Sequence, residues 1–119
     1  MLALDIDEPW TDSGCVIVEI AGQLDAISAP ALREEFSRIT ARPLRLIVAI
    51  DGLDHLDETG LGVLLGAARR ARDSGGGIAL VGPTGQVRRS LETKALTAIL
   101  RPCTSIEGAI AALCAREGA

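Results

Sequence analysis

Aromatic residues are nearly missing from this chain: it has Trp10, Phe36 and no tyrosine. A core without rings must be built from Leu, Ile, Val and Ala, whose small volumes suit helices packed closely on a sheet. The same lack excludes functions that need aromatic stacking platforms, such as sequence-tolerant binding of single-stranded nucleic acid. The net charge of −4 repels a phosphate backbone, so we expect no nucleic-acid partner. The one basic cluster, Arg69, Arg70 and Arg72, falls at the end of an expected helix, where cations complement the helix dipole.

Cysteine and histidine are also scarce. Cys15, Cys103 and Cys114 form no C-x-x-C pair, and their odd number makes no disulfide framework. We interpret them as reduced thiols, with a redox role for Cys103 and Cys114 as the alternative. The single histidine, His55, is interpreted as a solvated loop residue rather than a metal ligand. We therefore predict no metal, no cofactor and no catalytic residues, and the chain is not expected to be an enzyme.

Long apolar runs are absent as well. The longest, Leu61 to Ala68, includes two glycines and is far too short to cross a membrane. No signal peptide is recognisable. We expect a soluble, cytoplasmic protein without a membrane partner, monomeric or weakly dimeric. Residues 1–119 are expected to form a single domain.

Hydrophobic patterning predicts alternating strands and helices. An opening hairpin of two strands, at about 2–7 and 15–20 around a turn at 12–14, precedes a series of strand–helix repeats. The later strands are expected at 44–50, 78–81 and 98–102, the helices at 28–40, 58–73, 85–93 and 104–116, and a loop at 51–57. The fold class is therefore α/β, with a mainly parallel sheet of about five strands and about four helices.

Acidic and hydroxyl side chains gather at the start of the expected helix 58–73. Asp57 is the natural N-cap, Glu58 is the first-turn carboxylate, and Thr59 is the only hydroxyl there. The unpaired N–H groups and the positive dipole end of a helix stabilise anions by about 0.3–1 kcal/mol. By local physics alone, this cluster is a helix cap.

Three glycines in that helix look like a dinucleotide-binding pattern. However, Gly60 lies ten residues beyond Ile50, whereas pyrophosphate binding needs its glycines in the turn directly after a strand. We predict instead that Gly60 and Gly62 are packing or backbone positions. Gly62 and Gly66, one turn apart, are expected to let the helix approach the sheet or another helix closely.

Two segments resemble a known family. Asp57-Glu-Thr-Gly-Leu-Gly-Val-Leu-Leu-Gly66 resembles the signature of STAS-domain anti-sigma-factor antagonists, Asp-Ser-Ser/Thr-Gly-Leu-Gly followed by an apolar helix. Gly22-Gln-Leu-Asp25 resembles their Gly-Glu-Leu-Asp element, and the likeness runs from about Val16 to Leu113. The resemblance implies a STAS fold and a protein-interaction switch that binds a serine-kinase anti-sigma factor and so regulates transcription. It implies that the partner-binding residues are Asp25, Asp57, Glu58, Thr59, Gly60 and Leu61.

Glu58 departs from that family at its regulatory position. There the kinase phosphorylates the serine directly after the signature aspartate, and the phosphate breaks the complex. A carboxylate cannot accept phosphate in that scheme, and it carries about one negative charge where phosphoserine carries about 1.5 to 2. Three hypotheses follow: Glu58 imitates the released state, the partner surface has adapted to it, or Thr59 is the alternative phosphoacceptor. A function of another class is a STAS accessory or ligand-binding subunit, nucleotide-sensing or transporter-associated, with no sigma-factor role.

Overall fold

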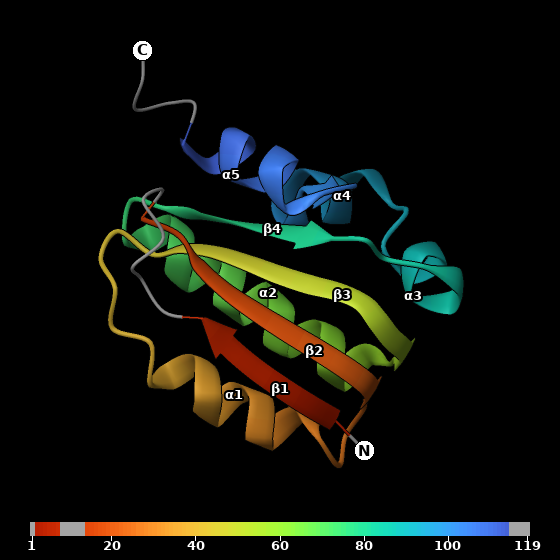
Figure 1. The fold of residues 1–119 in the computed structure, drawn as a ribbon. Helices are drawn as coiled ribbons and strands as arrows, with labels where there is room; N and C mark the ends of the chain where they lie inside the picture. The colour runs from red at the N-terminus through yellow and green to blue at the C-terminus, as the bar shows by residue number, and fades with distance from the viewer. Residues whose placement is uncertain (1, 8–13, 115–119) are drawn as a thin grey trace.

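The computed structural model describes residues 2–7 and 14–114, whose five strands and five helices are drawn in Figure 1. The strands are β1 (Leu2–Asp7), β2 (Val16–Leu24), β3 (Arg45–Leu56), β4 (Gly77–Val81) and β5 (Pro102–Cys103). The helices are α1 (Ala29–Ser37), α2 (Glu58–Asp73), α3 (Gly85–Ser90), α4 (Lys94–Leu100) and α5 (Ile106–Cys114).

The strands form one sheet in the order β1-β2-β3-β4-β5. β1 pairs antiparallel with β2, and the three other neighbouring pairs are parallel. This confirms the predicted α/β fold, with an opening hairpin and a mainly parallel sheet. Part of the predicted turn at 12–14 lies outside the described residues. No helix within residues 2–7 and 14–114 has both the length and the apolar character to span a bilayer.

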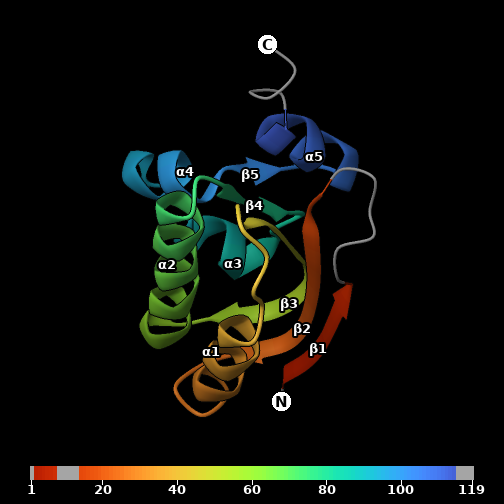
Figure 2. The same ribbon diagram turned by 90° about the vertical axis from the view of Figure 1, so that its left-hand side faces the viewer.

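Helices cover both faces of the sheet. Figure 2 shows α1 and α2 on one side and α5 on the other. Alternate residues of β3 point to the two sides: Val48 packs with Leu32 and Leu64 in the larger core, whereas Ile47 packs with Leu113 in the smaller one. This alternation follows from the pleat of a strand, and burial on both sides explains the continuous apolar run of β3.

The predicted loop at 51–57 is wrong, because β3 continues to Leu56. Its second half pairs with β2 through Gly22↔Leu53 and Leu24↔Leu56 after a shift in register. Pairing with β4 stops earlier, at Ala49↔Val81. At its end, Leu56 donates its N–H to Gln86 Oε1 at 3.0 Å and accepts from Gln86 Nε2 at 3.0 Å. The side chain of α3 thus bonds to the strand as a neighbouring backbone would.

The predicted strand at 98–102 is also wrong. Residues 98–100 belong to α4, which is the helix that the prediction of four helices lacked. Thr93 caps α4 by accepting the Leu96 N–H at 3.2 Å, so the chain is helical through Leu100. Arg101 ends the helix in the left-handed conformation at φ 45°, and β5 begins only at Pro102. The terminal helix was predicted to begin with a capping box at Thr104. Ser105 takes the capping position instead, accepting the Gly108 N–H at 3.0 Å.

Candidate functional site

The two segments singled out in the sequence meet at one end of the sheet. β2 and β3 are parallel neighbours, so their carboxyl ends lie at the same edge. The β2–α1 connection, residues 25–28, follows one strand, and the start of α2 follows the other (Figure 1). Asp57 N–H donates to Leu24 O at 3.2 Å, which ties the end of β2 to the beginning of α2. The fold therefore brings the predicted residues Asp25 and Asp57 into one site.

Asp57 links the two segments with its carboxylate. Oδ1 accepts the Gly60 N–H at 2.9 Å, which is the predicted N-cap bond of α2. Oδ2 accepts the Ala26 N–H at 3.2 Å, from the β2–α1 connection. One side chain thus caps the helix and positions the neighbouring loop.

Asp25 organises the loop itself. Its Oδ1 atom accepts the backbone N–H groups of Ile27 and Ser28, each at 3.0 Å. The Ser28 N–H bond, together with the Ser28 hydroxyl and the Ile27 N–H, holds the pKa of Asp25 below its usual value. Ser28 stands at the N-cap of α1 as predicted, but its hydroxyl makes no cap bond: it accepts the Asp25 N–H at 3.0 Å. Asp25 is therefore ionised, and its Oδ1 atom is bonded to backbone N–H groups of its own loop.

The other predicted site residues differ in exposure. Glu58 and Thr59 are exposed in the first turn of α2, Leu61 is half-buried against the core, and Gly60 is buried. The Glu58 carboxylate has no hydrogen-bond or ion-pair partner among residues 14–114. It stands at the positive end of the helix dipole, which stabilises its charge. The Glu58 carboxylate and the Thr59 hydroxyl are thus both exposed, with no bonding partner in the part of the chain that the structure describes.

Close packing in α2 falls on Gly60. A Cβ atom there would lie 2.6 Å from Leu24 Cγ and 2.8 Å from Leu24 O, so only glycine lets the helix start so near β2. The prediction for Gly62 and Gly66 is wrong, because a Cβ at either position meets nothing within 4 Å. Both glycines face solvent, since the buried face of α2 is formed mainly by Val63, Leu64 and small alanines.

Groups suited to metal binding do not converge in the described part of the chain. No three His, Cys, Asp or Glu side chains of that part are placed to hold a metal ion. His55 is exposed, as predicted, although it lies on β3 and not in a loop. Cys15 is buried, and Cys103 is a half-buried thiol whose pKa is raised by burial. The side chain of Cys114 lies outside the described residues.

The structure reveals two roles that the sequence did not indicate, one for Ile27 in the site and one for Arg70 at the far end of α2. Ile27, at the tip of the β2–α1 loop, is 91% exposed. Arg70 lies at the other end of α2 and donates to Phe36 O and Ile39 O, so it satisfies carbonyls at the end of α1. It was predicted to complement the dipole of its own helix. No sequence pattern marks either role, because both depend on contacts far along the chain.

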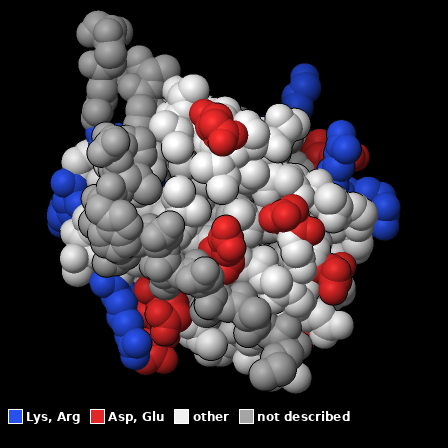
Figure 3. Space-filling view, in the orientation of Figure 1, with Lys and Arg blue, Asp and Glu red and all other residues white. Residues whose placement is uncertain are grey.

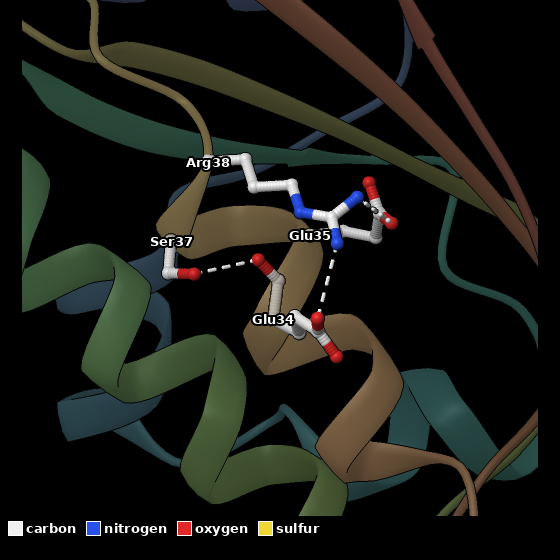
Figure 4. Close-up of polar contacts among 4 residues, drawn as sticks. All are labelled: Glu34, Glu35, Ser37 and Arg38. Carbon is white, nitrogen blue, oxygen red and sulfur yellow. Dashed lines mark hydrogen bonds and ion pairs between the residues drawn. The ribbon is translucent and has the colours of Figure 1, made fainter.

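Charges elsewhere are either paired or dispersed. On α1, Arg38 bonds to Glu34 at 3.0 Å and to Glu35 at 3.4 Å, while the Ser37 hydroxyl donates to Glu34 O (Figure 4). Figure 3 shows acidic side chains spread over the middle of one face, with Lys and Arg at its margin. Exposed acidic residues of the strands include Glu19 and Asp54. That face carries dispersed acidic groups and no continuous basic patch among the residues described.

Comparisons with known proteins agree with this architecture. The family model described as "STAS domain" matches residues 10–109. The anti-sigma-B factor antagonist of Bacillus subtilis is 29% identical over 93 residues, covering 78% of this chain and 85% of that protein. The crystal structure of an anti-sigma factor antagonist from Mycobacterium paratuberculosis aligns with a TM-score of 0.81 at 20% identity, covering 95% of this chain and 94% of the other. The Bacillus cell fate determinant SpoIIAA in its phosphorylated form aligns with a TM-score of 0.66 at 21% identity, covering 88% and 95%.

Proposed function

Because this chain belongs to the STAS domain family and is similar to its anti-sigma factor antagonists, we propose that it binds a serine-kinase anti-sigma factor through the site at the start of α2. Proteins of this kind are regulators and not enzymes. The proposed contact surface consists of Asp25, Asp57, Glu58, Thr59, Gly60 and Leu61. Binding would free a sigma factor and so act on transcription.

We further propose that phosphorylation control at position 58 is lost. The supporting observation is the exposed Glu58 carboxylate, unpaired among residues 14–114, in the helix turn where the family resemblance expects a serine. It holds a fixed negative charge at the place where related proteins gain one by phosphorylation. A carboxylate has no hydroxyl to transfer phosphate to, so the charge cannot be switched by a kinase. Glu58 then imitates the released state, unless the partner surface has adapted to it.

Substitution at position 58 separates these hypotheses. Purified wild type, Glu58→Ser and Glu58→Gln are each titrated into serine-kinase anti-sigma factors of the source organism by calorimetry. If Glu58 imitates phosphoserine, both variants bind more tightly than wild type by about 5- to 150-fold, because both lose the charge (about 1–3 kcal/mol). If both differ from wild type by less than about twofold, the interface has adapted. Binding of no variant to any such factor contradicts the proposed function.

Phosphate mapping tests the control site. With ATP and the kinase that binds, mass spectrometry is expected to find phosphate on Glu58→Ser and none on wild type or Glu58→Gln. The glutamine variant is the matched control, since it loses the charge without gaining a hydroxyl. Phosphate on Thr59 of the wild type, absent in Thr59→Val, would show that control has moved by one residue.

A further inference from the structure

The most exposed large apolar side chain in the described structure lies in this site. Ile27 is 91% exposed, whereas Ile99 on α4, the other such residue among residues 14–113, is 44% exposed. Single exposed apolar residues are common on protein surfaces and need no explanation by themselves. The loop that carries Ile27 distinguishes it from such residues.

Every backbone N–H group from Asp25 to Ala29 is hydrogen-bonded. The acceptors are Ser28 Oγ for residue 25, Asp57 Oδ2 for residue 26, Asp25 Oδ1 for residues 27 and 28, and Asp25 O for residue 29, at 2.8–3.2 Å. Five consecutive donors are thus satisfied within one short connection. A loop fixed in this way loses little further entropy when a partner binds. This hydrogen-bonded loop therefore holds Ile27 in a fixed, solvent-exposed position.

The acidic residues of the site divide into two groups by what their oxygens contact. Asp25 Oδ1 and both oxygens of Asp57 accept bonds from the loop and the helix start. Glu58 is different, because its exposed carboxylate accepts no hydrogen bond from any residue within 14–114. Among the residues described, the exposed groups of the site with no such bond therefore include the apolar side chain of Ile27 and the carboxylate of Glu58.

We propose that Ile27 is the apolar anchor of the partner-binding surface, and that it enters a pocket of the serine-kinase anti-sigma factor that is lined by apolar side chains. Within the proposed contact surface, Asp25 and Asp57 also act as positioning residues, because their carboxylates hold the loop that carries Ile27. This inference rests on the proposed function and names the partner chemistry at the same site. Rigid, desolvated apolar side chains near the centre of an interface carry much of its affinity.

Binding of Ile27 variants tests the proposal. The probe is a serine-kinase anti-sigma factor of the source organism that binds the wild-type chain. Ile27→Ala is expected to weaken binding by about 10-fold or more, mainly through faster dissociation, and Ile27→Leu by less than about threefold. Ile99→Ala is the matched control, because it removes the same atoms from an exposed site on α4, and it is expected to leave affinity within twofold. Thermal melts of the free proteins verify that each variant is folded.

The support of Ile27 by its hydrogen-bonded loop is tested with Ser28→Ala, which removes the acceptor of the Asp25 N–H while leaving Ile27 intact. Ser28→Ala is expected to slow association or reduce affinity in the wild-type background but not in the Ile27→Ala background. The effects of the two substitutions on affinity should therefore not add in the double variant. Equal affinities of wild type and Ile27→Ala for a factor that binds overturn the inference while the proposed function stands. Binding of no such factor to the wild type removes both. If sedimentation instead shows a wild-type dimer that Ile27→Ala abolishes, the occupant is a second copy and the inference is wrong.

Discussion

Replacing Asp57 by alanine is expected to lower the free energy of unfolding by about 1–3.5 kcal/mol. Loss of the N-cap bond to the Gly60 N–H, 2.9 Å in the structure, costs about 0.5–2 kcal/mol. Loss of the bond from Oδ2 to the Ala26 N–H, at 3.2 Å, adds about 0.5–1.5 kcal/mol. The total is large for one substitution at a half-exposed position, because the residue joins two segments 31 positions apart.

Asp57→Ser separates the two contributions. Serine is a good N-cap and its single hydroxyl can serve Gly60, but it is too short to serve Ala26 as well. It should therefore retain the cap and lose the bridge, which places its stability between wild type and Asp57→Ala. Arg38→Ala is the control, since its ion pairs with Glu34 and Glu35 are exposed and are worth less than about 0.5 kcal/mol.

Urea denaturation followed by circular dichroism measures these differences. The midpoint should fall in the order wild type, Asp57→Ser, Asp57→Ala, with an unchanged slope, because the folded and unfolded surfaces remain the same. If Asp57→Ala matches wild type within about 0.3 kcal/mol, neither bond stabilises the fold. If the two variants are equally unstable, the bond to Gly60 is not the main effect of the residue.

Other substitutions give further expected outcomes. Gly60→Ala should lower the free energy of unfolding by about 1–3 kcal/mol in urea titrations, because its Cβ would lie 2.8 Å from Leu24 O. Gly62→Ala, in open space on the same helix, should raise it by about 0.5–1 kcal/mol. The opposite order of stability would contradict the packing role of Gly60. Since the pKa of Asp25 is lowered in the folded state, its contribution is full above its unfolded value of about 3.9 and is lost as pH falls through the folded value. The stability difference between wild type and Asp25→Asn should therefore be constant near pH 7 and change only below about pH 4; a change between pH 5 and 7 would exclude this cause. Arg70→Met, which keeps the length of the chain but no donors, should reduce stability by about 1–3 kcal/mol, because the carbonyls at the end of α1 lose a charged partner, and equal melting of the two proteins would show that water replaces it.

Local signals in the sequence were sufficient for some elements. The bounds of α2 agree with the prediction because Asp57 provides a cap at one end and Ser74 with three glycines ends the helix at the other. The apolar run of β3 likewise indicated a doubly covered strand. Such features depend on neighbours in the chain, so they can be recognised without knowledge of the fold.

Contacts between distant segments were not predictable in the same way. The polar residues from Asp51 to Asp57 have the composition of a loop, yet β2 supplies the pairing that keeps them extended to Leu56. Ala98 to Leu100 has the composition of a short strand, but the Thr93 cap and burial of Leu100 make it helical. The bridge from Asp57 to Ala26 and the exposure of Ile27 arise only after the segments meet, so the site was predicted by position but not in its internal organisation.

The amide of Gln86 has a consequence for how the molecule behaves among its own copies. Beyond Ala49, β3 has lost β4 as a neighbour, and a free row of peptide groups on an extended strand invites another chain to add itself there and begin aggregation. Gln86 bonds to the last of these groups by offering one acceptor and one donor to Leu56, and these are the bonds that a neighbouring strand would otherwise supply. Being part of α3, it cannot itself be extended by further strands. At Leu56, the end of the long strand β3 is therefore closed to the addition of another strand.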